Sequence, residues 1–176
     1  ELKGKTLGII GFGRIGQETA KIALGIGMDI VYYDKYKEST ELKLEFTQNK
    51  SLSFNINTST LDEVLMKSDF ITLHVPAQKE YIIGKNEFKK MKDGVGIINA
   101  ARGGVINETE LINYIENKKV SFAGLDTFEN EPNPSVKLLM HPKISLSPHI
   151  GAATSEAQNR IGIELADQII NYFKND

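Results

Sequence analysis

Short apolar runs alternate with amphipathic stretches along almost the whole chain. The runs have the length and continuous hydrophobicity of strands that are buried on both faces. We predict strands over residues 6–10, 29–33, 69–74, 95–99, 120–125 and 143–146. Helical spacing or capping signals predict helices over residues 14–25, 61–67, 85–91, 107–117 and 155–173. This alternation predicts an α/β fold, a doubly wound parallel sheet of about six or seven strands.

Local signals add detail to three of these helices. In the first, Ile15, Thr19, Ile22 and Ala23 can share one face, which is the expected packing face. Thr60 and Asn107 are predicted N-caps of two later helices, and each is followed three residues on by a glutamate that completes a capping box.

Residues 35–58 fit the alternation least well. The stretch is polar, rich in Lys, Ser, Thr and Asn, and its strongest strand signal is a weak one over residues 52–54. We interpret it as a long variable connection between the second and third predicted strands.

Composition narrows the class of protein. The chain has 176 residues, 40% hydrophobic and 25% charged, with no second composition regime, which is typical of one globular domain. Its net charge of −2 gives no reason to expect a nucleic acid or a membrane surface as partner. The absence of cysteine excludes disulfides and thiolate chemistry. Because the chain has no cysteine, we expect a cytoplasmic protein. No apolar run approaches the roughly 18 residues of a membrane span.

A glycine-rich turn follows the first predicted strand. Gly11, Gly13 and Gly16 stand between a strand and a helix, as the dinucleotide-binding fingerprint requires. Asp34 ends the second strand, eighteen residues after Gly16, near the position of an acid that binds the adenosine ribose. Because a carboxylate there repels a 2′-phosphate, the sequence predicts NAD rather than NADP as cofactor.

Three polar residues in the second half of the chain suggest chemistry beyond nucleotide binding. Arg102, Glu131 and His149 each follow a predicted strand, so the carboxyl edge of one sheet can bring them together. The guanidinium of Arg102 suits a carboxylate, and an imidazole can move a proton near neutral pH. We expect His74, at the end of another strand, to be structural. No histidine pair has metal-ligand spacing, and we expect no metal.

Five ordered motifs resemble the NAD-binding domain of the D-isomer-specific 2-hydroxyacid dehydrogenases, over nearly the whole chain. They are residues 2–16, 73–76 (Leu-His-Val-Pro), 99–104 (Asn-Ala-Ala-Arg-Gly-Gly), 124–132 and 147–151 (Ser-Pro-His-Ile-Gly). The resemblance implies that Arg102 binds the substrate carboxylate, that His149 is the general acid/base and that Glu131 is its partner. It also implies a cofactor site formed by Gly11, Gly13, Arg14, Ile15, Gly16, Asp34, Val75, Pro76, Ala100, Ala101, Arg102, Asp126, His149, Gly151 and Ala152.

The resemblance carries further expectations. Residues 151–160 are most similar to the phosphoglycerate dehydrogenase subfamily, which oxidises D-3-phosphoglycerate in serine biosynthesis. A glyoxylate/hydroxypyruvate reductase, a D-lactate dehydrogenase and an NAD-sensing co-repressor stay open as alternatives. The family implies a small 2-hydroxy or 2-keto acid as substrate and a homo-oligomer. We expect residues 1–176 to be one NAD-binding domain of a longer chain, inactive without its substrate domain.

Overall fold

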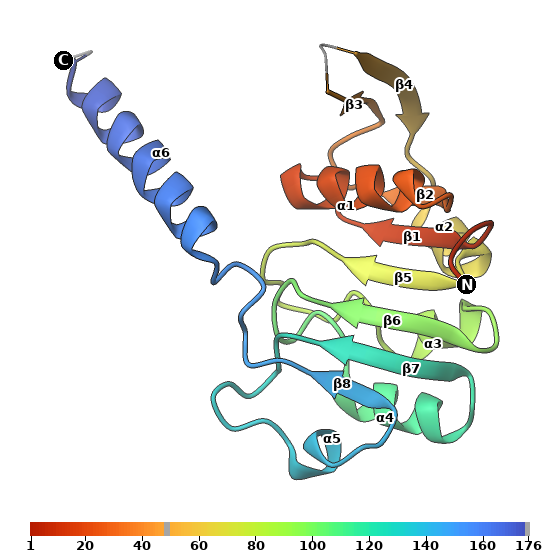
Figure 1. Ribbon diagram of the computed structural model, residues 1–176. Helices are drawn as coiled ribbons and strands as arrows, with labels where there is room; N and C mark the ends of the chain where they lie inside the picture. Colours follow the sequence, from red (N-terminus) through yellow and green to blue (C-terminus); the bar gives the residue numbers. More distant parts are fainter. Residues whose placement is uncertain (48–49, 175–176) are drawn as a thin grey trace.

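Six strands form one parallel sheet, in the order β2-β1-β5-β6-β7-β8 (Figure 1). The computed structural model describes residues 1–47 and 50–174. The chain runs outward from β1 to β2 and then returns to the other side of β1, so the strand order reverses between β1 and β5. The predicted doubly wound sheet is confirmed, with strands β1 (Thr6–Ile10), β2 (Asp29–Tyr33), β5 (Phe70–Leu73), β6 (Val95–Asn99), β7 (Val120–Leu125) and β8 (Ile144–Leu146).

The predicted helices are also present, and a short helix was not foreseen. That helix, α5, occupies Val136–Leu139 in the connection to β8. Thr60 and Glu63 form the predicted capping box. Asn107 accepts a hydrogen bond from the Glu110 amide, but its own amide donates to the Ile83 carbonyl, so the second capping box is only half formed. The other helices are α1 (Arg14–Gly25), α2 (Leu61–Lys67), α3 (Lys85–Lys90), α4 (Glu108–Glu116) and α6 (Ser155–Lys174).

Helix α1 packs through a face that shares only Ala23 with the buried part of the predicted one. Its buried residues are Gly16, Ala20 and Ala23, whereas Ile15 and Ile22 are about two-thirds exposed. Small residues at positions i, i+4 and i+7 let the helix lie close to β1, and this close approach decides the packing face over side-chain hydrophobicity. The core on the α1 side is correspondingly small. The larger core, which includes residues of α2, α3 and α4, is a separate cluster.

The stretch predicted to be a long variable connection contains a β-hairpin. Strands β3 (Ser39–Glu45) and β4 (Ser51–Asn57) pair antiparallel and form a second sheet beyond β2 (Figure 1). Apolar residues alternate with polar ones, and Leu42 is fully buried. This period of two is a strand signal, but the surrounding polar residues hid it. Residues 48 and 49 of the predicted connection lie outside the described residues.

Helix α6 stands apart from the sheet (Figure 1). Its apolar residues Ile161, Leu165 and Ile169 are half exposed or more, so they lie outside the core that the described residues form. A surface ion pair of 3.0 Å joins Glu164 to Arg14 of α1. Although α6 has 20 residues, neither it nor any other helix in the described part of the chain has the apolar length that membrane crossing requires.

Candidate active site

The sequence-predicted site residues lie on loops that leave one edge of the sheet. All six strands are parallel, so their carboxyl ends share that edge. The reversal of strand order between β1 and β5 opens a crevice there, which is where open α/β sheets bind ligands. The loops are the glycine-rich turn after β1, Asp34 after β2, residues 74–78 after β5, 100–104 after β6, 126–135 after β7 and 147–154 after β8.

The geometry of the glycine-rich turn requires glycine at two positions. Gly11 has φ +91°, and a side chain there would strike the His74 carbonyl. A Cβ on Gly16 would strike the Gly11 carbonyl, so this residue lets α1 begin directly against the turn. Gly13 differs from both, because a Cβ there would meet nothing within 4 Å. The first turn of α1 contains no acidic residue and its N-cap makes no side-chain hydrogen bond. Its amides are therefore available to a phosphate.

Asp34 lies against this turn. One carboxylate oxygen accepts a hydrogen bond of 2.7 Å from the Phe12 amide, and the other accepts one of 2.8 Å from the Tyr36 amide. A pocket of about 530 Å³ extends from Asp34 along the turn to Val75 and Pro76. An anion-binding helix start, an open approach at Gly13 and a carboxylate at the end of β2 fit a dinucleotide with an unphosphorylated ribose.

The contrast between Gly13 and Gly16 gives a prediction that separates binding from folding. In the full-length protein, Gly13→Ala should weaken NAD binding by on the order of tenfold, since the new methyl occupies the phosphate approach. Its melting temperature should stay close to that of the wild type. Gly16→Ala should instead lower stability by about 1–3 kcal/mol, because the methyl overlaps the Gly11 carbonyl. Calorimetric titration and thermal unfolding check both. Unchanged NAD affinity in Gly13→Ala would count against a phosphate at this turn.

The loop after β6 is fixed by a buried asparagine that the sequence analysis missed. Asn99 is only 3% exposed, and its side-chain amide donates to the Arg102 carbonyl at 2.9 Å. Its side-chain oxygen accepts from the Ala101 amide at 3.0 Å. The sequence signal that could have identified Asn99 is a polar residue at the end of an apolar strand. The Arg102 side chain is exposed, and its guanidinium donates to the Ala101 carbonyl at 2.6 Å.

Asp126 joins the end of β7 to the loop after β8. Its carboxylate accepts hydrogen bonds from the Ser147 hydroxyl (2.6 Å), the Ile150 amide (2.8 Å) and the Gly151 amide (2.8 Å). Burial by itself would raise the pKa of Asp126, but these hydrogen bonds and the nearby His149 together lower it. Asp126 is therefore an ionised anchor for the segment that carries His149. Ser147 is a second residue that the sequence analysis overlooked.

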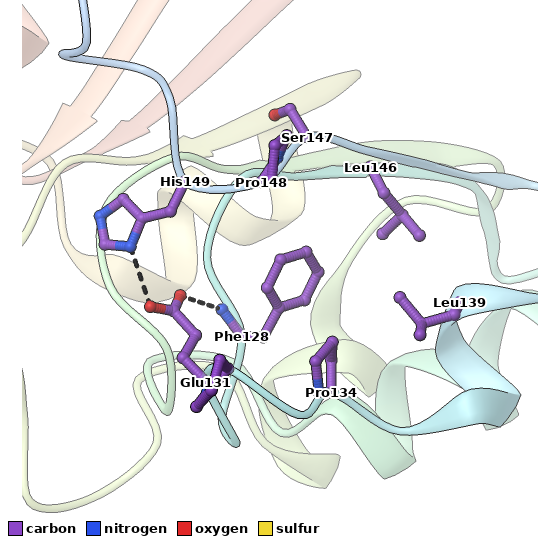
Figure 2. Close-up of a pocket in the computed structure, with 9 residues that line it drawn as sticks. Phe128, Glu131, Pro134, Leu139, Leu146, Ser147, Pro148 and His149 are labelled. Carbon is purple, nitrogen blue, oxygen red and sulfur yellow. Dashed lines mark hydrogen bonds and ion pairs between the residues drawn. The ribbon is translucent and has the colours of Figure 1, made fainter.

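Glu131 and His149 contact each other directly (Figure 2). His149 Nδ1 lies 2.9 Å from one oxygen of Glu131, and the other oxygen accepts from the Phe128 amide at 2.9 Å. The hydrogen bond from His149, followed by that from Phe128, lowers the pKa of Glu131. Because an ionised carboxylate can only accept, Nδ1 carries the hydrogen and Nε2 is left to exchange a proton. His149 has φ +56°, a left-handed conformation that is uncommon outside glycine and recurs at functional sites.

Two further pockets lie at this edge of the sheet, and the Glu131–His149 pair lines the first of them. One, of about 390 Å³, is bounded by Glu131 and His149 and otherwise mostly by apolar side chains, among them Phe128, Leu139 and Leu146 (Figure 2). The other, of about 330 Å³, lies between the ends of β6, β7 and β8 and is lined in part by Ala100, Asp126 and Gly151. The predicted site residues thus border three pockets along one edge of the sheet.

Some of the predicted site residues do not contact one another. No hydrogen bond or ion pair within residues 1–47 and 50–174 links Arg102 to Glu131 or His149. Ala101 is buried. Arg14, Ile15 and Ala152 are exposed near the site, and Arg14 pairs with Glu164.

His74 has the surroundings of a structural histidine. Its Nε2 lies 3.3 Å from the Thr19 hydroxyl and 3.2 Å from the Thr72 hydroxyl, and burial lowers its pKa. These contacts tie β5 to α1 under the glycine-rich turn, although His74 also borders the 530 Å³ pocket. Among the described residues, no three His, Asp or Glu side chains are grouped as a metal site would require.

Known proteins resemble this chain in both sequence and fold. Residues 1–151 match the family described as D-isomer specific 2-hydroxyacid dehydrogenase, NAD binding domain. The chain is 48% identical over 174 residues to a hydroxypyruvate reductase of Thermotoga maritima, covering 96% of this chain and 53% of that protein. It is 41% identical over 177 residues to a D-3-phosphoglycerate dehydrogenase of Archaeoglobus fulgidus, covering 99% and 32%.

A solved structure gives the same picture. A D-lactate dehydrogenase from Aquifex aeolicus, in complex with NAD and lactic acid, superposes with a TM-score of 0.77 at 31% identity. The match covers 100% of this chain and 55% of that one. This chain therefore spans between a third and a little over half the length of these relatives.

Proposed function

This chain belongs to the D-isomer-specific 2-hydroxyacid dehydrogenase family, and on that premise we propose that it is the NAD-binding half of an enzyme that interconverts a D-2-hydroxy acid and its 2-keto acid. Members of this family are NAD-dependent oxidoreductases that act on the CH–OH group of such acids. The observation that carries the proposal is the 2.9 Å contact between Glu131 and His149 at the sheet edge that also bears the dinucleotide turn.

We assign the proton transfer in this reaction to His149. Oxidation of a 2-hydroxy acid removes a hydride from C2 and a proton from the hydroxyl, and bound NAD supplies the hydride acceptor. His149 Nε2 takes the hydroxyl proton, and in the reverse direction it returns that proton to the keto oxygen. Glu131 holds Nδ1 at 2.9 Å and stabilises the imidazolium, so that Nε2 faces the reacting oxygen.

Arg102 and the cofactor loops complete the proposed site. The guanidinium of Arg102 would leave the Ala101 carbonyl and bind both oxygens of the substrate carboxylate. Asp34 would hold the adenosine ribose, while Gly11, Gly13 and Gly16 shape the turn that, with Arg14 and Ile15, receives the pyrophosphate. The residues assigned to the nicotinamide side are Val75, Pro76, Ala100, Ala101, Asp126, Gly151 and Ala152.

We propose D-3-phosphoglycerate as the substrate, with reduction of hydroxypyruvate as the second candidate. The similarity of residues 151–160 to the phosphoglycerate dehydrogenase subfamily and a relative of that name at 41% identity support the first. The hydroxypyruvate reductase at 48% identity supports the second. The keto acid formed from D-3-phosphoglycerate is 3-phosphohydroxypyruvate, which differs from hydroxypyruvate only by a phosphate on C3. Recognition of that phosphate therefore decides between the two substrates.

A comparison of substrates tests this proposal in the full-length protein. With NADH present, kcat/KM for 3-phosphohydroxypyruvate should exceed that for hydroxypyruvate by on the order of tenfold or more, because a phosphate adds charge-assisted contacts. Pyruvate should be a poor substrate, and NADPH a poor replacement for NADH. The loss of the NADH absorbance as the cofactor is oxidised gives each rate. A preference for pyruvate would overturn the substrate assignment. NADH binding without turnover of any of these acids would instead favour an NAD-sensing binding protein.

A further inference from the structure

Two glutamates bridge the segments that follow β6 and β7. The Glu108 carboxylate accepts a hydrogen bond of 2.7 Å from the Glu129 amide, and the Glu129 carboxylate accepts one of 2.8 Å from the Glu108 amide. Glu108 is the first residue of α4, the helix that follows the Arg102 loop, whereas Glu129 lies two residues before Glu131. Each side chain therefore holds the backbone of the other segment.

The same two segments also meet without side chains. A Cβ added to Gly103 would overlap the Phe128 carbonyl group, so the backbones of the Arg102 loop and the Glu131 loop are in contact at this point. Phe128 in turn donates its amide to the Glu131 carboxylate at 2.9 Å. The consecutive amides of Phe128 and Glu129 thus fix the loop on both sides, one to Glu131 and the other to Glu108.

The bridge between Glu108 and Glu129 costs folding free energy. Glu108 is only 9% exposed, and burial, together with the charges of Glu129 and Glu131, raises its pKa even though the Glu129 amide opposes this shift. Burying a carboxylate costs stability, which hydrogen bonds offset only in part. If the bridge holds the Glu131 loop in place, that function accounts for two carboxylates at this position despite their cost.

We propose that Glu108 and Glu129 are positioning residues that set the Glu131–His149 pair relative to Arg102. The inference rests on the proposed dehydrogenase function, because it assigns the bridge to the geometry of that reaction. Neither glutamate touches a reacting atom. Their hydrogen bonds determine where Glu131 lies, and Glu131 determines where the His149 ring points.

Replacing Glu108 in the full-length protein tests the bridge. Glu108→Ala removes the acceptor for the Glu129 amide, and kcat should fall on the order of 10- to 100-fold through misplacement of Glu131. KM for the keto acid should change much less, and NADH affinity should stay as in the wild type. Glu108→Gln keeps a side-chain oxygen for that amide and should restore most of the rate. Glu116→Ala, at an exposed carboxylate on the same helix, is the matched control and should behave as the wild type.

Amide hydrogen exchange separates this inference from the proposed function. Exchange within residues 126–131 should be faster in Glu108→Ala and close to wild type in Glu108→Gln, whether or not the protein turns over a keto acid. If the wild type turns over no keto acid but exchange is faster in Glu108→Ala, the proposed dehydrogenase function is refuted while the structural bridge is supported. Unaltered exchange, or altered exchange with full kcat, would overturn the positioning role. If Glu108→Ala does not fold, Glu129→Ala applies the same test, because it removes the acceptor for the Glu108 amide.

Discussion

Replacing His149 with glutamine in the full-length enzyme should lower kcat by on the order of 10²- to 10⁴-fold, the usual contribution of a general acid/base. Glutamine keeps a similar length and can still hydrogen-bond to Glu131, but it cannot take up or release a proton. NADH affinity should fall much less than kcat, because His149 does not line the dinucleotide pocket between the glycine-rich turn and Asp34. Steady-state rates with the best keto acid, together with fluorescence titration of NADH, measure both quantities.

His141 provides a control for this result. His141→Gln alters a loop histidine after α5 whose ring Nδ1 accepts a hydrogen bond of 3.2 Å from the Lys143 amide, and it should leave kcat unchanged. Glu131→Gln should produce an intermediate loss, since an amide oxygen still accepts from Nδ1 without the charge that favours the imidazolium. Turnover that survives in His149→Gln would show that another group moves the proton.

Replacing Arg102 with glutamine should cost about 2–5 kcal/mol of transition-state binding, a loss of roughly 30- to 4,000-fold in kcat/KM. The substrate carboxylate would then lose its cationic partner at the mouth of the site. Arg102→Lys keeps the charge but not the planar fork, so most of the loss should remain. The measurement is kcat/KM for the keto acid in the same assay, with the melting temperature as the check on folding.

A surface cation serves as the comparison for Arg102. Lys137 is exposed and pairs with Glu116 across 3.4 Å, so Lys137→Gln should leave kcat/KM as in the wild type. Full activity in Arg102→Gln would mean that a cation outside residues 1–176, or elsewhere in the chain, binds the carboxylate. Recovery in Arg102→Lys would show that charge alone, without the bidentate geometry, is sufficient.

The fold was largely predictable because its signals are local. The strands of the parallel sheet are short apolar runs, and the cap at Thr60 needs only a partner three residues away. Two of the departures from the predicted fold involve competition between signals. In α1, the close approach permitted by Gly16, Ala20 and Ala23 overrode the more hydrophobic Ile15 and Ile22. In β3 and β4, alternation was hidden by the many polar residues around it.

The candidate site was predictable to a different extent. The motifs indicated which residues to consider, and the parallel sheet brings their loops to one edge. The residues that hold those loops were not indicated, because each acts through a contact with a distant segment. Asn99 fixes the Arg102 loop, Ser147 binds Asp126, and Glu108 bonds to Glu129 across 21 positions in the chain.

The sequence by itself therefore determined the class of fold, the dinucleotide turn and the identity of the polar trio, since all of these depend on residue type and spacing along the chain. Only the tertiary structure decided that Glu131 and His149 meet at 2.9 Å, that Asp34 is bonded to the glycine-rich turn, and that Glu108 supports the Glu131 loop. Hydrogen bonds between loops depend on how the chain brings distant amides and carboxylates together, and no local pattern encodes that distance.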